Sequence, residues 1–219
     1  WVVMSILAGV TSFEVAVGLA LATSVVFLVL GRLTGGSIKL LEITDVVFFV
    51  GLMIVGAVSG KSVTDWLETW SGELSNLALV AIAVGSMLLR RPFTIDYARE
   101  ETPREYWTSP VFIHTNYVIT GFWAGAFIVA AISGFIGDAV LDNSNNLWTG
   151  WIIQTGAMIV AIQFTLWYPR VVRARSLQAA GKPTDPPPPV SELLVSLAAY
   201  LPIVGIVSLS FDAAPDWVG

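Results

Sequence analysis

The residues of this chain whose types could support chemistry are concentrated in one segment, RRPFTIDYAREETPREYWTSP, at positions 90–110. It is the longest polar stretch of the sequence and combines arginine, carboxylate, tyrosine and proline; we refer to it as the elbow. Its charged and aromatic side chains could dock a cytoplasmic or membrane partner, or close a pore. The candidate residues within it are Arg91, Asp96, Tyr97, Arg99 and Glu100.

Four further candidates lie in the apolar segments that precede and follow the elbow. Glu42 and Asp45 are three residues apart, so a helix would place them on one face. Ionisable groups in lipid are costly, so we expect this pair either to form ion pairs with an elbow arginine or to line a cation or proton path. His114 and Asn116 follow the elbow, where His114 could titrate between roughly pH 5 and 8 or be hydrogen-bonded at the membrane interface.

Small residues recur at a spacing of four in the apolar segment after the elbow. Gly121 and Gly125 form a G-x-x-x-G motif, and Ser133 with Gly137 repeats the spacing. Small residues let helix backbones approach closely in a membrane, so these positions predict a packing face within the protein or toward a second copy. Hydrogen bonds between helices are expected from the amides Asn76, Gln154 and Gln163.

The composition places all of these residues in a membrane protein. Of 219 residues, 55% are hydrophobic and only 12% are charged, and the mean hydropathy is +0.76. The apolar runs are long enough for helices that cross a hydrocarbon core about 30 Å thick, and the alternating pattern of a membrane β-barrel is absent. The expected fold is therefore all-α: a polytopic transmembrane helix bundle with about six to seven membrane helices.

The apolar runs and their breaks predict one transmembrane helical domain over residues 1–219. A proline-rich linker is expected at 181–190, before the last span. The chain starts at Trp1 without a methionine and its first apolar run is too short to cross, which suggests that upstream residues are missing. The expected spans are 1–10 (partial), 14–33, 40–60, 73–89, 111–137, 147–168 and 193–211.

The elbow itself carries the signals of an ordered turn. Pro92 ends the preceding helix, and TPRE has the form of a capping box with Thr102 as its N-cap. Ser109 followed by Pro110 predicts the start of the next span in the same way. A helix between these points would place Asp96 on one face with Arg99 or Glu100.

The basic residues predict the orientation of the bundle. With these spans, ten basic residues fall on the side of the elbow and only Lys61 falls on the other side. The positive-inside rule makes the elbow cytoplasmic and places the C-terminus outside. The ten residues are Arg32, Lys39, Arg90, Arg91, Arg99, Arg104, Arg170, Arg173, Arg175 and Lys182.

Residue types exclude several kinds of cofactor site. A retinal Schiff base needs a lysine inside a span, and no lysine lies in the expected spans. Bis-histidine haem needs two histidines, and the chain has one. No cysteine, glycine-rich phosphate loop or hydrolase motif is present, so no cofactor or metal is predicted. The expected partners are the lipid bilayer and other membrane subunits or a second copy, with no nucleic acid.

The elbow also resembles a known signature. The motif R-P-F-T-x-x-Y-A-R-E at 91–100, followed by TPREYWTSPVF, is similar to that of a family of uncharacterised bacterial inner-membrane proteins often labelled intracellular septation protein A-like. The resemblance covers about residues 14–170, and the span after KPTDPPPPV departs from it. It implies a multi-pass protein of the bacterial cytoplasmic membrane and no particular activity.

Two functional hypotheses from different classes remain open. In the first, the protein is a non-catalytic subunit or scaffold whose elbow docks a partner. In the second, the bundle is a transporter or channel for a small ion or solute. Its cytoplasmic entrance would be lined by Glu42, Asp45, Glu100, His114 and Asn116. The few ionisable groups within the spans favour the first hypothesis. A membrane enzyme acting on lipid is a third possibility that no motif supports.

Overall fold

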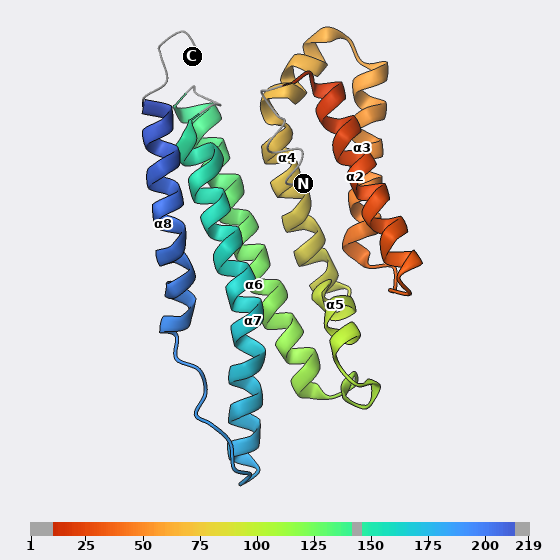
Figure 1. Ribbon diagram of the computed structural model, residues 1–219. Helices are drawn as coiled ribbons and strands as arrows, with labels where there is room; N and C mark the ends of the chain where they lie inside the picture. Colours follow the sequence, from red (N-terminus) through yellow and green to blue (C-terminus); the bar gives the residue numbers. More distant parts are fainter. Residues whose placement is uncertain (1–10, 142–145, 213–219) are drawn as a thin grey trace.

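The computed structural model describes residues 11–141 and 146–212, and within these ranges the chain forms helices with no strand (Figure 1). Turns join most of the helices, and a longer irregular segment over 180–190, the predicted proline-rich linker, precedes the last one. The predicted all-α class is confirmed. The predicted partial span at 1–10 lies outside the described residues. The long helices are α2 (Phe13–Leu33), α3 (Leu40–Val58), α4 (Lys61–Leu88), α6 (Pro110–Phe135), α7 (Ile153–Ala179) and α8 (Ser191–Asp212).

Five helical stretches of the described chain are long and apolar enough to cross a membrane, which indicates a multi-pass integral membrane protein. They are Phe13–Leu33, Leu40–Val58, Lys61–Leu88, Pro110–Val140 and Trp148–Ala179. The fourth stretch joins α6 to a π-helical turn, η2 (Ile136–Val140), and the fifth begins with another, η3 (Trp148–Ile152). The last predicted span falls on α8.

Two helices extend well beyond their predicted spans. Helix α4 begins at Lys61 rather than at residue 73, since the polar segment before Glu73 continues the helix and buries Leu67 and Ser71. Helix α7 continues to Ala179, past a proline at position 169 that lies inside the helix. Hydropathy locates the lipid-crossing part of a helix, whereas helical hydrogen bonding continues into the polar flanks.

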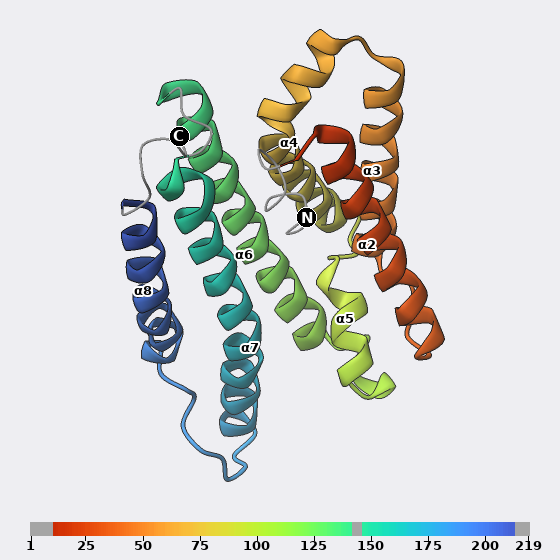
Figure 2. The same cartoon turned by 45° about the horizontal axis from the view of Figure 1, so that its top comes forward.

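Helix α6 lies between α4 and α7 and has the most extensive contacts of the bundle (Figure 1). Helices α2 and α3 pair with each other and contact α4, whereas α8 packs along α7. Both views show the short helix α5 (Thr94–Glu101) beside the end of α4, on the same end of the bundle as the α2–α3 turn (Figure 2).

Buried apolar side chains form separate clusters along this arrangement. One cluster joins α2, α3 and α4 around Phe13, Val17 and Phe49. A second joins α4 and α6 and includes Phe93 of the elbow: Leu79, Ala83, Phe93, Ala124 and Phe127. The elbow is therefore anchored in the core of the bundle, which fixes its position relative to α4 and α6.

Large apolar side chains also cover the outside of the bundle. Phe27 on α2 and Val47 on α3 are both 65% exposed, and many neighbours on the same helices are exposed too. An apolar surface of this extent is unfavourable in water, and lipid tails are its natural environment. The exposed residues thus support the same conclusion as the lengths of the helices.

Ser109 starts α6 as predicted, since its Oγ accepts a hydrogen bond from the backbone N–H of Phe112 at 3.1 Å and Pro110 follows at the first helical position. Replacing Ser109 with alanine should lower the free energy of unfolding by about 1 kcal/mol, because this N–H loses its acceptor. Chemical denaturation in detergent micelles measures the change. Ser109→Asp, which retains an acceptor, should keep most of the stability; equal losses in both variants would contradict the capping role.

Candidate functional site

The elbow begins with a tight turn that reverses the chain after α4. Arg90 adopts a left-handed backbone (φ 59°), and the N–H of Arg91 donates to the carbonyl of Ser86 at 2.9 Å. This is the pattern of a Schellman C-cap, with arginine at the position where glycine is usual. The Ser86 hydroxyl then accepts from the N–H of Phe93 at 3.1 Å. These bonds hold the elbow backbone against the end of α4.

A buried polar network ties α5 to α6. The hydroxyl of Thr94 lies 3.1 Å from Oδ1 and 3.1 Å from the carbonyl oxygen of Asn116, and 2.9 Å from the hydroxyl of Thr120. The amide of Asn116 donates to the carbonyl of Phe112 at 2.9 Å, so its polar atoms are used. Asn116, a predicted site residue, is 2% exposed and has this structural role.

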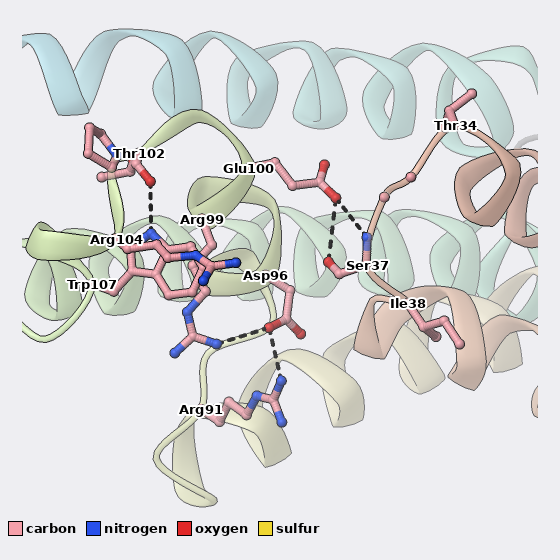
Figure 3. A pocket seen from close by; sticks show the side chains of 13 residues that line it. Thr34, Ser37, Ile38, Arg91, Asp96, Arg99, Glu100, Thr102, Arg104 and Trp107 are labelled. Carbon is pink, nitrogen blue, oxygen red and sulfur yellow. Dashed lines mark hydrogen bonds and ion pairs between the residues drawn. The ribbon is translucent and has the colours of Figure 1, made fainter.

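Asp96 is the centre of the charged part of the elbow. Its Oδ1 lies 3.0 Å from Nη2 of Arg91 and 3.5 Å from Nη1 of Arg99 (Figure 3). The side chain of Asp96 is only 8% exposed, whereas those of Arg91 and Arg99 are 64% and 35% exposed. The buried carboxylate therefore relies on two arginines that themselves reach the surface.

Glu100 connects α5 to the α2–α3 turn. Its Oε1 accepts from the N–H and the hydroxyl of Ser37, each at 3.4 Å, and lies 3.2 Å from Nζ of Lys39 (Figure 3). Burial alone would lower the pKa of Lys39, but the carboxylates of Glu100 and Glu42 outweigh it and the pKa is raised. Lys39 is thus a bridge between the two parts of the site, and it remains charged.

Trp107 lies in the segment after α5 and forms one wall of the site. Its indole N–H donates to the carbonyl of Thr102 at 2.8 Å (Figure 3). The guanidinium groups of Arg99 and Arg104 lie over its ring at 5.1 and 5.7 Å from the centroid, within cation–π range. Two arginines are therefore held against one aromatic ring at the edge of the elbow.

These groups line one cavity of about 760 Å³ between the α2–α3 turn and the elbow (Figure 3). Three arginines and two carboxylates line it, which leaves one positive charge in excess. The lining residues are Thr34, Gly35, Gly36, Ser37, Ile38, Arg91, Asp96, Arg99, Glu100, Thr102, Pro103, Arg104 and Trp107. Its paired charges suit the binding of a charged group better than acid–base catalysis.

The spare positive charge can be assigned to particular atoms. Within the described ranges, no carboxylate lies in ion-pair distance of Arg104, whose recorded contact is with the Trp107 ring. Nε of Arg99 is buried and has no hydrogen-bond acceptor among the described residues. Because Nε of Arg99 is buried, the unused guanidinium donors on this side of the cavity belong to the exposed Arg104.

The remaining predicted residues lie outside this cavity lining. Glu42 pairs with Lys39 at 3.5 Å and caps the start of α3, rather than pairing with an elbow arginine. Tyr97 lies under Nζ of Lys39, 5.1 Å from its ring centroid; burial and the charges of Glu42 and Asp45 raise its pKa. Glu42 and Asp45 thus influence Tyr97, and Glu42 also pairs with Lys39, instead of either acid pairing with an arginine of the cavity. The described side chain of His114 is exposed on α6.

The predicted capping box at Thr102 is wrong. A single 3₁₀ turn, η1 (Arg104–Tyr106), follows Pro103 without any side-chain cap. Thr102 instead ends α5, and its carbonyl accepts the Trp107 indole N–H. The turn is too short to leave the set of unpaired N–H groups that a capping box satisfies, so the aromatic hydrogen bond holds the backbone in place of the cap.

Ser37, Lys39, Arg104 and Trp107 are site residues that the sequence reasoning missed. Lys39 and Arg104 were used only to predict the orientation of the bundle from its basic residues. The adjacent glycines Gly35 and Gly36 were the available sequence signal. In the structure Gly35 has φ +82°, and a side chain on Gly36 would lie 3.4 Å from Oε1 of Glu100 and 2.9 Å from the carbonyl oxygen of Gly31. Two adjacent glycines between apolar segments indicate a tight turn that another element approaches closely.

The predicted small-residue face divides into two parts. Gly121 and Gly125 are exposed, and a side chain added at either would meet no atom within 4 Å, so this motif packs against no described helix. Ser133 and Gly137 are buried, and the Ser133 hydroxyl donates to the carbonyl of Thr149 at 2.9 Å. Only the second half of the face packs within the described protein.

The comparisons with known proteins add no functional assignment. No protein-family model, curated protein or solved structure matches the chain. The similarity of the elbow motif to the septation protein A-like family therefore stays a prediction. Among the described residues, no group of three or more histidine or carboxylate side chains could hold a metal ion.

Proposed function

We propose that this multi-pass membrane protein is a non-catalytic subunit or scaffold of a membrane assembly, and that the elbow cavity docks an acidic segment of a partner protein. The observation that carries the proposal is the pair of arginines held on Trp107: Arg99 is also bound to Asp96, whereas no described carboxylate lies within ion-pair distance of Arg104. Planar guanidinium groups bind carboxylates through paired hydrogen bonds, and stacking on an aromatic ring fixes their direction.

The surroundings of the cavity support docking because they hold it in one shape. Asp96 pairs with both Arg91 and Arg99, and Glu100 joins α5 to Ser37 of the opposite wall and to Lys39. A site that is ordered before binding avoids part of the entropy loss on association. The excess positive charge favours an acidic segment over a basic or apolar one.

The apolar cluster between α4 and α6 supports a scaffold over an open channel. Leu79, Ala83, Ala124 and Phe127 pack together between the polar network at the elbow and the polar residues farther along α4. A continuous water path along this helix pair would have to cross that cluster. The transporter hypothesis is favoured by one observation only, the buried carboxyl group of Glu73 within α4.

The experiment places a photo-crosslinking amino acid at Tyr106, which is 53% exposed in the turn between Arg104 and Trp107. Crosslinking in native membranes should capture a stoichiometric protein partner. Arg104→Glu should reduce capture at least tenfold, because a like charge would then face the acidic segment. High salt should weaken capture as well, since the site is open to solvent.

Arg175→Glu is the matched control, because Arg175 is an exposed arginine on α7 outside the cavity. It should leave capture unchanged. Capture that resists Arg104→Glu would contradict the proposal, and capture of lipid alone would show that an anionic headgroup occupies the cavity. Proton or cation flux through the purified protein reconstituted alone would support the transporter hypothesis instead.

A further inference from the structure

A second group of polar residues lies in α4, far from the elbow and separate from the proposed docking site. Glu73 lies fifteen residues before the end of α4 at Leu88, which corresponds to about 22 Å along a helix. In a hydrocarbon core about 30 Å thick, this places Glu73 in the half of the bundle remote from the elbow. The residue is 9% exposed, so a carboxyl group is buried at a depth where charge is costly.

The backbone of α6 is shaped to receive this side chain. A side chain on Gly134 would overlap Oε1 of Glu73, so only glycine leaves room for the carboxyl group there. The same position would lie 3.3 Å from the amide nitrogen of Gln154. Gln154 in turn accepts from Asn76 at 3.3 Å and donates to the carbonyl of Thr149 at 3.0 Å. Three helical elements therefore enclose the carboxyl group of Glu73.

The hydrogen bonding of this enclosure is incomplete. Oε2 of Glu73 is buried and has no hydrogen-bond donor among the described residues. The hydroxyl of Thr149, a residue 8% exposed, is also buried without a partner. Nearly all buried polar atoms in proteins are paired, so an ionised carboxylate is disfavoured in this enclosure.

The neighbour that faces Glu73 is another acid. The carboxyl group of Asp138, in η2, lies within hydrogen-bonding reach of Glu73 and is the titratable group whose charge acts on it. Among the described residues, no basic group is found to act on Glu73. Lys61, at the start of α4, is twelve residues away, about 18 Å along the helix.

Two ionised carboxylates in contact repel strongly, and the burial of Glu73, with Asp138 half-buried beside it, strengthens the repulsion. Neither can donate a hydrogen bond to the other unless one keeps its proton. We infer that Glu73 and Asp138 form a proton-binding site, in which a single proton is shared between the two carboxyl groups and supplies the missing donor. The proton belongs to the pair rather than to either residue, as in other coupled carboxyl dyads.

The site has the features that proton binding requires. Gly134 leaves room for the carboxyl group of Glu73, and the amides of Asn76 and Gln154 provide neutral polar surroundings. The rings of Trp70 and Phe135, three residues before Glu73 and Asp138, contact each other at 6.0 Å between centroids. Since residues three apart share a helix face, this aromatic contact lies on the same side of the two helical segments as the carboxyl pair.

Infrared difference spectroscopy of the full chain in lipid tests the inference, because a protonated carboxyl group has a C=O stretching band that an ionised one lacks. At pH 7 the wild-type protein should show such a band, and it should shift in D₂O. The band should disappear in Glu73→Gln and change in Asp138→Asn. Asp65→Asn, which alters an exposed carboxylate of the same helix, should leave it unchanged.

Absence of the band in the wild-type protein would overturn the shared proton, and so would a band that survives both Glu73→Gln and Asp138→Asn. The wild-type spectrum decides the first point even if a variant fails to fold. A thermal unfolding temperature that rises with sodium concentration, and that Glu73→Gln makes insensitive to sodium, would identify a cation in place of the proton. These results are independent of crosslinking at the elbow, so either proposal can fail alone.

Discussion

Replacing Arg91 and Arg99 together with methionine is expected to lower the free energy of unfolding by about 3–5 kcal/mol, because it leaves the buried carboxylate of Asp96 without a counter-charge. Each arginine contributes one contact to Oδ1 of Asp96, at 3.0 and 3.5 Å. Either single replacement should cost much less than half of the double loss, since the remaining arginine still faces the carboxylate. Reversible denaturation in mixed micelles measures these differences.

The controls use residues of the same type and a compensating change. Arg173→Met with Arg175→Met, two exposed positions on α7, should change stability by less than about 0.5 kcal/mol each. Adding Asp96→Leu to the double arginine variant should restore much of the lost stability, because no buried charge then remains. Strictly additive losses across this cycle would show that the three residues do not form one ion-pair group.

Replacing Thr94 with valine is expected to cost about 1–3 kcal/mol, the usual cost of leaving buried polar groups unpaired. The hydroxyl of Thr94 joins Asn116 and Thr120, and all three residues are at most 7% exposed. Because this network ties α5 to α6, the substitution should lower the stability of the whole protein and also loosen α5 locally. Amide hydrogen exchange over 94–101 should become faster in the variant.

Thr108→Val provides the comparison for this second prediction, because Thr108 is an exposed threonine of the same elbow. It should alter neither the stability nor the exchange of α5. If Thr94→Val leaves exchange at 94–101 unchanged, α5 is held by its ion pairs alone, and the polar network has no part in positioning the cavity.

Local sequence signals predicted much of the fold and part of the candidate site. The start of α3 at Leu40 and of α6 at Pro110 agree with the predicted spans to within one residue. Hydropathy marks both starts, and at α6 the Ser109–Pro110 capping signal coincides with it. The spacing of Asp96 and Arg99 predicted a shared helix face, and they form an ion pair at 3.5 Å. Interactions within one helical turn can be inferred from spacing alone.

Contacts between distant segments could not be predicted in this way. Glu100 and Lys39 are separated by 61 residues, and their pairing depends on how α5 packs beside the α2–α3 turn. The sequence reasoning paired Glu42 with an elbow arginine because both were near the membrane boundary, whereas Lys39, three residues from Glu42, takes that place. The charge of a residue and its expected depth in the membrane do not identify its ion-pair partner unless the packing of the helices is known.

Glu73 shows a different reason for a missed residue. The predicted span started at this position, so the carboxyl group was placed at the boundary, where an acid needs no explanation. Helix α4 begins twelve residues earlier, at Lys61, so Glu73 lies inside the helix rather than at its start. There α6 and α7 pack around its side chain and bury it. A hydropathy window marks where lipid contact begins, and it does not report which polar residues near that point are buried by neighbouring helices.

The most direct test of this interpretation asks on which side of the membrane the arginine-lined cavity opens. The chain has no cysteine, so single cysteines at Thr108 in the elbow and at Ser62 at the start of α4 can be labelled without background. Ser62 is exposed at the start of α4, and Thr108 is exposed in the elbow, which follows the opposite end of α4. An impermeant maleimide should label Thr108→Cys only in inverted membrane vesicles and Ser62→Cys only in right-side-out vesicles. Labelling of Thr108→Cys from the outside, or of both positions from one side, would contradict the proposed membrane arrangement and the docking site that depends on it.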